Sequence, residues 1–194
     1  MGKRFSKSLG RRTHSKTEAR ISTLDENEAL GILDSLEEDP FLLILDQVQD
    51  PRNLGACLRS ADGAGVNLVI IPSDRSVGIT DVVRHVASGA AEALPIARVR
   101  NLARFMKELQ ARGVRLVGTS DQAKCTIFDS DLKGSLGLVV GAEETGIRRL
   151  TADNCDQLVN IPMRGSIECL NVSVATGVCL FEAFRQRIPF HKKG

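Results

Sequence analysis

The sequence predicts an α/β fold in which helices cover both faces of a mainly parallel sheet. Short apolar runs alternate with stretches of helical periodicity along most of the chain, which favours strand–helix–strand units. Most of the apolar runs are continuous instead of alternating, as is typical of strands buried on both faces. The length of 194 residues suits one domain of this kind and leaves little room for a second.

Six apolar runs are the expected strands, and five stretches between and after them are the expected helices. A polar lead-in with helical character, 25–39, precedes the first strand, and Gly113 ends the third helix. The expected strands are 41–48, 67–72, 94–99, 114–120, 136–141 and 157–162. The expected helices are 53–64, 79–90, 101–112, 146–152 and 170–187.

The last expected helix is apolar on nearly every side over its first three turns. A helix of this kind is buried on two sides. We expect one side to pack on the domain itself and the other on a partner subunit. One face carries Leu170, Val174, Val178 and Phe181, and another carries Val172, Ala175, Cys179 and Ala183.

Positive charge is concentrated at the N-terminus, although the formal net charge of the chain is only +2. Residues 1–20 hold seven Lys/Arg and the single acid Glu18, with no apolar periodicity. We therefore divide the chain into a basic flexible arm with a short helical lead-in, 1–38, and one folded domain, 39–190. The arm is either a solvated tail or a contact for nucleic-acid phosphates, and its Arg- and Ser-rich composition also fits an organelle transit peptide.

The cysteine content and the hydropathy favour a cytoplasmic protein. The five cysteines are odd in number and include no C-x-x-C pair, which indicates neither a disulfide framework nor a zinc site, and no metal is expected. No segment reaches the apolar length of a membrane span, so no membrane contact is expected.

Polar residues concentrate in the loops that follow four of the expected strands, where open α/β sheets place their chemistry. These loops contain "DPRNLG", "GTS", "GAEETG" and "IPMRGSIECLN". The third is not a phosphate-binding P-loop, because Gly146 is followed by Ile147 and Arg148 instead of Lys and Ser/Thr. No G-x-G-x-x-G fingerprint occurs either.

Each candidate site residue in these loops also has an ordinary structural interpretation. Asn53 stands where a helix cap is expected, and Asn171 is either a cap or a site residue. Arg59 falls off the apolar stripe of its helix, as a solvated residue would. Glu143 and Glu144 precede a helix whose dipole favours acids. These alternatives stay open on the residue pattern alone.

Three stretches together resemble the SpoU/TrmH family of RNA 2′-O-ribose methyltransferases, which belongs to the SPOUT class. They are "NLGACLRSADGAG" with Asn53 and Arg59, "LVVGAEETGIRRL" with Glu143, and "IPMRGSIECLNVSVATGVCLFEAFRQR" with Asn171. They stand in the family's order, and the resemblance covers about 41–187. The wording is most similar to the RlmB type, which methylates a guanosine ribose of 23S ribosomal RNA.

This resemblance implies a homodimer that uses S-adenosyl-L-methionine (AdoMet) to methylate structured RNA, with active sites at the subunit interface. It also implies a C-terminal deep trefoil knot, although knotted chains are nearly absent from proteins. Arg59 is expected to stabilise the developing alkoxide or an adjacent phosphate, because a guanidinium seldom gives up its proton. The implied catalytic residues are Asn53, Arg59, Glu143 and Asn171. The implied cofactor contacts are Thr119, Gly141, Ile161, Met163 and Leu170, largely through backbone groups.

The chain departs from the family pattern in two places. The family usually has Ser where this chain has Cys169, and a thiol is a poorer hydrogen-bond partner than a hydroxyl. Close relatives carry an RNA-binding domain ahead of the catalytic one, whereas about 40 residues precede the first expected strand here. We expect ribosomal RNA as the substrate. The alternatives are a transfer RNA 2′-O-methyltransferase and a non-catalytic RNA-binding or ribosome-assembly factor.

Overall fold

The computed structural model describes residues 23–143 and 145–188. The predicted arm, 1–20, lies outside the described residues, as do Glu144 and the end of the expected domain, 189–190. Seven described strands form one all-parallel sheet in the order β3-β2-β1-β6-β4-β7-β5. They are β1 (Phe41–Asp46), β2 (Leu68–Pro72), β3 (Ile96–Val99), β4 (Arg115–Thr119), β5 (Cys125–Thr126), β6 (Leu136–Gly141) and β7 (Gln157–Asn160).

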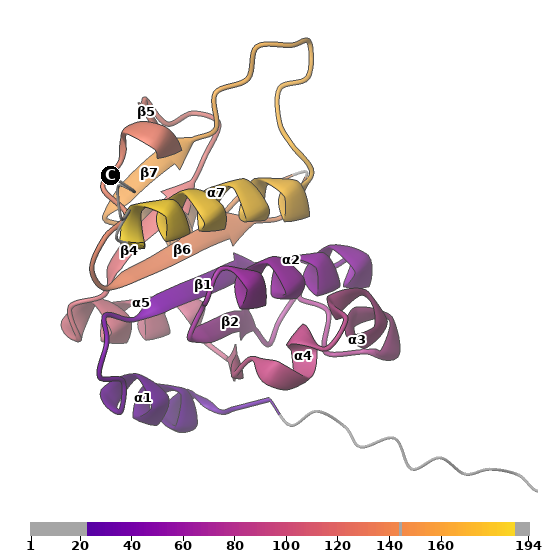
Figure 1. Ribbon diagram of the computed structural model, residues 1–194, viewed down its shortest axis with the longest axis vertical. Coiled ribbons are helices and arrows are strands. Elements are labelled where there is room, and N and C mark those ends of the chain that lie inside the picture. The colour runs from indigo at the N-terminus through magenta and orange to yellow at the C-terminus, as the bar shows by residue number, and fades with distance from the viewer. Residues whose placement is uncertain (1–22, 144, 189–194) are drawn as a thin grey trace, which may run out of the picture.

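Helices cover both faces of this sheet, as predicted (Figure 1). The side chains of α2, α3, α4 and α7 share a core with one face of the sheet, and those of α1 and α5 share a core with the other. The helices are α1 (Glu26–Asp34), α2 (Pro51–Gly63), α3 (Asp81–Ala87), α4 (Ala90–Ala93), α5 (Leu102–Ala111), α6 (Arg149–Asp153) and α7 (Val172–Arg187), with a 3-10 turn, η1, at Ile127–Asp129.

Strand β1 shows why the apolar runs are continuous. Successive side chains of a strand point to opposite faces of the sheet. Leu43 and Leu45 therefore join the core beneath α2 and α7, while Leu42 and Ile44 join the core beneath α1 and α5. All six residues of β1 are buried, so the prediction of a sheet covered on both faces is confirmed.

The six predicted strands and the predicted helices are present, with shifted boundaries. The expected helix 79–90 is two helices, because Ser88 and Gly89 both adopt left-handed backbone conformations between α3 and α4. The expected helix 146–152 begins later, at Arg149. Strand β5, which has two residues, and η1 were not predicted.

Helix α7 packs along α2, and only one of its two apolar faces is covered within the chain. Val172, Cys179 and Ala183 are buried, whereas Val174 is 51% exposed and Phe181 is 48% exposed. The prediction that one apolar face packs on the domain is therefore confirmed, and the other face remains at the surface of this chain. None of the described helices combines the length and apolar character that crossing a membrane requires.

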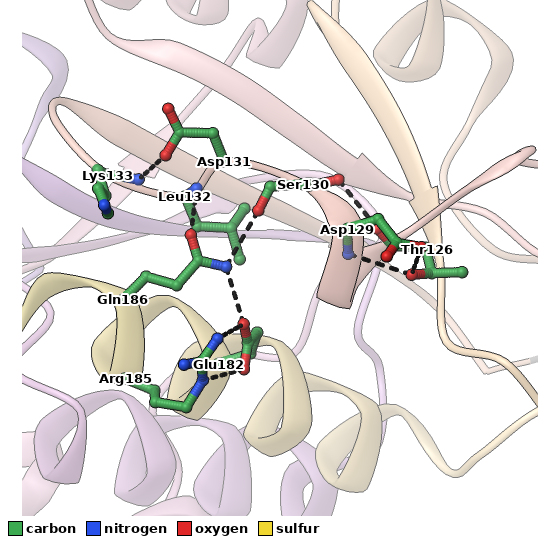
Figure 2. Close-up of polar contacts among 9 residues, drawn as sticks. All are labelled: Thr126, Asp129, Ser130, Asp131, Leu132, Lys133, Glu182, Arg185 and Gln186. Carbon is green, nitrogen blue, oxygen red and sulfur yellow. Dashed lines mark hydrogen bonds and ion pairs between the residues drawn. The ribbon is translucent and has the colours of Figure 1, made fainter.

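The last two turns of α7 are tied to the segment that precedes β6, as Figure 2 shows. Gln186 accepts a hydrogen bond from the Leu132 N–H (2.9 Å) and donates one to the Ser130 carbonyl oxygen (3.0 Å). The Glu182 carboxylate accepts two hydrogen bonds from the Arg185 guanidinium (2.7 and 2.8 Å) and one from Gln186 (2.8 Å). These contacts fix the C-terminal end of α7. The candidate site lies at the other end of the helix, beside its first residue.

Candidate active site

Asn53, Glu143 and Asn171 meet beyond the carboxyl ends of the strands. Asn171 Nδ2 donates to Asn53 Oδ1 (3.1 Å) and to Glu143 Oε1 (3.2 Å), and Asn53 Nδ2 lies 3.4 Å from Glu143 Oε2. Each side chain contacts the other two, although 118 residues separate Asn53 from Asn171. The structure therefore brings together three of the four residues predicted to be catalytic.

Asn53 is not the cap of α2. Asp50 occupies that position and its carboxylate accepts the Arg52 N–H (2.7 Å), while Pro51 begins the helix. Asn53 lies inside the first turn, where its amide is free to reach Glu143. The structural interpretation of Asn53 as a helix cap is therefore wrong.

Asn171 is both a cap and a member of the cluster. Its Oδ1 accepts the Ser173 N–H (3.0 Å) and the Ser173 hydroxyl (2.6 Å), which satisfies the start of α7. Its Nδ2 is left to donate to Asn53 and Glu143. The two functions use different ends of the same amide, so capping fixes the direction in which the donor points.

Glu143 lies on a short hairpin and not at a helix terminus. Ala142 and Gly146 pair through two backbone hydrogen bonds (3.1 and 2.9 Å), and α6 begins only at Arg149. Gly146 has φ of +62°, which favours glycine. The interpretation of Glu143 as an acid in the first turn of the next helix is therefore wrong.

Arg59 does not join this cluster within one chain. It lies six residues beyond Asn53 on α2, which places it about 9 Å along the helix axis and about 240° around it. Its guanidinium is exposed, and Nη1 lies 3.4 Å from Ser88 Oγ. Any contact between Arg59 and the cluster must therefore come from another copy of the chain or from a rearrangement.

Beside the cluster, a cavity of about 730 Å³ lies among the carboxyl ends of β4, β6 and β7, the loop 161–171 and the start of α7. Glu143 lines this cavity as well as belonging to the cluster, so the two share an edge. All five residues predicted to contact the cofactor line it: Thr119, Gly141, Ile161, Met163 and Leu170.

The cavity also contains residues that the sequence analysis did not single out. Asp121 and Thr126 enter from the segment around β5, and Glu168 enters from the loop after β7. The sequence could have indicated them only by their place in loops near strand ends. For Asp121 and Thr126 this was not possible, because the two residues of β5 are too few to show the alternation of a strand.

Cys169 lines the cavity and is exposed, unlike most of the other cysteines. Burial raises the pKa of Cys57 to about 11 and that of Cys179 to about 12. Burial is also the main cause that raises the pKa of Cys155 to about 12. Cys169 is therefore the one exposed thiol of the five, and it lines the cavity.

The cavity and the cluster lie within a stretch of the chain that matches a known protein family. The SpoU rRNA Methylase family matches residues 40–181, which include all four residues predicted to be catalytic. The chain belongs to this family. Membership implies the knotted SPOUT fold, which the all-parallel sheet with flanking helices fits.

Curated relatives in the SpoU family are similar over most of this chain. A protein from Ralstonia nicotianae named 23S rRNA (guanosine-2'-O-)-methyltransferase RlmB is 58% identical over 172 residues, which are 89% of this chain and 68% of the relative. One of the same name from Shewanella oneidensis is 61% identical over 148 residues, which are 76% of this chain and 60% of the relative. The chain thus spans about two thirds of their length.

Solved structures in the family share the fold. The SpoU methyltransferase AviRb from Streptomyces viridochromogenes, in complex with AdoMet, has a TM-score of 0.73 and 30% identity over 78% of this chain and 62% of that one. An AdoMet-bound rRNA methyltransferase from Sinorhizobium meliloti also has a TM-score of 0.73, with 31% identity over 79% of this chain and 59% of that one.

The charges around the cavity fit AdoMet, which carries a sulfonium cation and no polyphosphate. The charged residues that line the cavity are Asp121, Glu143 and Glu168, and no described Lys or Arg lines the cavity. Three carboxylates would repel a polyphosphate and attract a cation. The cavity would therefore hold AdoMet through strand-end backbone groups, with the carboxylates near its positive charges.

Proposed function

We propose that this protein transfers a methyl group from AdoMet to the ribose 2′-hydroxyl of a guanosine in 23S ribosomal RNA. The meeting of Asn53, Glu143 and Asn171 at the edge of the cavity carries the proposal. The RlmB relatives, at 58–61% identity, support the choice of nucleotide and RNA. This substrate also favours the cytoplasm as the protein's location.

The reaction requires that the ribose hydroxyl be aligned with the methyl group and that a base accept the hydroxyl proton. AdoMet, when bound, supplies the methyl group on a sulfonium centre. The ribose oxygen forms a bond to that carbon as the carbon–sulfur bond breaks, the sulfur keeps the electron pair of that bond and leaves as a neutral thioether, and the hydroxyl proton passes to the Glu143 carboxylate. Holding the hydroxyl in line with the methyl group supplies much of the acceleration.

In this mechanism Glu143 is the acceptor that positions the ribose hydroxyl. Its two oxygens already accept from Asn53 and Asn171, which fixes the plane of the carboxylate and leaves lone pairs free. A hydroxyl donated to one of them is held beside the cavity. The two amides keep the carboxylate oriented and cannot themselves take the proton.

Arg59 completes the site from the second subunit of a homodimer. It lies about 9 Å from Asn53 along the axis of α2 and on another side of that helix, so it does not join the cluster of its own chain, and its guanidinium is exposed. The outer apolar face of α7, with Val174 and Phe181, supplies a surface for the subunit contact. In the partner's site the guanidinium would stabilise the developing alkoxide or the adjacent phosphate.

The basic N-terminal arm would also contact RNA phosphates, in addition to Arg59. Residues 1–20 carry seven Lys/Arg and one acid, whereas residues 23–188 carry 17 Lys/Arg and 23 acids. A folded domain with this excess of acids repels a polyanion at long range. The basic arm offsets that repulsion, and it would make binding depend on salt.

Labelled methyl transfer tests the proposal directly. Purified protein is incubated with radiolabelled AdoMet and either 23S ribosomal RNA or transfer RNA, and the modified sites are mapped by their resistance to alkaline cleavage. We expect label in 23S RNA at one guanosine ribose, and weaker, less salt-dependent binding by a chain that lacks residues 1–20. Label confined to transfer RNA would show a different substrate, and no label in either RNA would favour an assembly factor.

A further inference from the structure

One residue, Asp46, contacts both ends of the loop that carries Glu143. Asp46 is the last residue of β1, and its backbone pairs in the sheet with Gly141, where the loop begins. Its side chain contacts Arg148, where the loop ends: Oδ2 accepts the Arg148 N–H (3.0 Å), and Oδ1 lies 2.6 Å from Arg148 Nη2. Asp46 therefore holds the start and the end of the loop together.

This pair is buried on one side and incompletely satisfied. Asp46 is fully buried and the Arg148 side chain is 37% exposed. Asp46 Oδ1 lies within ion-pair distance of Arg148 Nη2, but neither Asp46 Oδ1 nor Arg148 Nε has a hydrogen-bond partner among the described residues. Such a pair adds little net stability, because desolvation offsets the attraction. Its value lies in fixing where the loop sits.

The loop that the pair closes serves both the cluster and the cavity. Glu143 bonds Asn53 and Asn171, while Gly146 and Ile147 form part of the cavity wall. Ile147 is seated on β4, where its side chain would lie 2.9 Å from a Cβ added at Gly118. A shift at the Arg148 end would therefore move Glu143 and the wall together.

We propose that Arg148 is a positioning residue that, through the buried Asp46, sets Glu143 against the two asparagines and closes one wall of the AdoMet cavity. The inference rests on the proposed function for its catalytic consequence only. Arg148 is not among the residues that line the cavity. It acts by holding Glu143, Gly146 and Ile147 in the arrangement in which cofactor binding and hydroxyl alignment occur together.

The adjacent arginine provides a matched control. Arg149 has a side chain that is 96% exposed, and its contact with Asp153 is a long one of 3.9 Å within α6. Arg148→Gln and Arg149→Gln thus remove the same charge at neighbouring positions, one from the loop closure and one from the surface. Arg148→Lys keeps a cation near Asp46 and the backbone contact of the loop.

The test compares these variants in amide exchange, cofactor binding and kinetics. We expect Arg148→Gln to speed exchange at Gly146 in the free protein and to raise the Kd for AdoMet about tenfold or more. It should lower kcat by roughly 10- to 100-fold with an unchanged KM for RNA, since a displacement on the order of 1 Å can cost about 100-fold. Arg148→Lys should recover most of each change, and Arg149→Gln should match the wild type.

Two outcomes would overturn the proposal. One is equal exchange and equal AdoMet affinity in Arg148→Gln and Arg149→Gln. The other is a lowered melting temperature in Arg148→Gln with the kinetics of the folded protein intact. If Arg148→Gln does not fold, the same measurements of amide exchange, AdoMet affinity and kinetics on Asp46→Asn and Arg148→Lys test the proposal instead. The exchange measurement needs no RNA, so it separates this inference from a failure of the proposed function.

Discussion

Gly141 is the position at which the cavity has least room for change. A Cβ at this residue would lie 2.0 Å from the carbonyl carbon of Gly146 and 2.1 Å from the Ile147 nitrogen. These are backbone atoms, which cannot turn aside as a side chain can. The end of β6 must therefore be glycine for Gly146 and Ile147 to pack against it and form part of the cavity wall.

Gly141→Ala is expected to abolish AdoMet binding at concentrations that saturate the wild type. The added methyl group would push the hairpin off the end of β6, and overpacking of this kind typically costs about 1–3 kcal/mol or more. Calorimetric titration with AdoMet measures the loss. Gly165→Ala is the control, because a Cβ there meets nothing within 4 Å. Normal AdoMet affinity in Gly141→Ala would contradict this account of the wall.

At the residue scale, the sequence separated the site residues from their structural alternatives only through the family resemblance. Asn53 occupies a place where a cap is common, and only the structure shows that Asp50 performs the capping. The importance of Asp46 was hidden because it ends a buried apolar strand, and its partner Arg148 is 102 residues away. Contacts between residues so far apart leave no local pattern.

Among the elements, α7 connects the site to the opposite end of the sheet. Its first residue follows Asn171, and its last turns hold the segment before β6 through Glu182 and Gln186 (Figure 2). Arg187 lies over the Phe41 ring, 4.5 Å from its centroid, and contacts the Gly134 carbonyl oxygen. The helix is therefore anchored at both ends, which keeps Asn171 in register with Asn53.

The anchoring of α7 is expected to depend on pH through Glu182. Hydrogen bonds from Arg185 lower the pKa of Glu182, so its stabilising contribution is present at neutral pH and is lost as the pH falls through that lowered pKa. Glu182→Gln should lower the melting temperature at pH 7 by on the order of 2 °C, and the difference should shrink below roughly pH 4. Glu168→Gln, in the exposed loop, controls for the lost charge. A difference that grows in acid would refute the assignment.

The sequence predicted elements better than their boundaries. Most of the six longer strands were predicted from continuous apolar runs, because burial on both faces of the sheet leaves that pattern. Strand β5 escaped because two residues carry no period. The break between α3 and α4 was not predicted, because Ser88 adopts a left-handed backbone conformation that is uncommon for serine.

For the whole molecule, the central claim is that one active site draws on two subunits. Asn53, Glu143 and Asn171 come from one chain, and the Arg59 of that chain contacts Ser88 instead of joining them. The exposed apolar face of α7 would give a second chain a place to pack. The proposed symmetric dimer would contain two sites, each with one guanidinium from the other chain.

Mixing two inactive variants measures this claim most directly. Arg59→Ala and Asn171→Ala are each expected to lose methyl transfer when alone. Exchange of subunits in an equal mixture makes half of the dimers mixed, and each mixed dimer has one site with both residues intact, so about a quarter of wild-type activity should return. If Arg59 served its own chain's site, no intact site would form, and a mixture as inactive as its components would contradict the account.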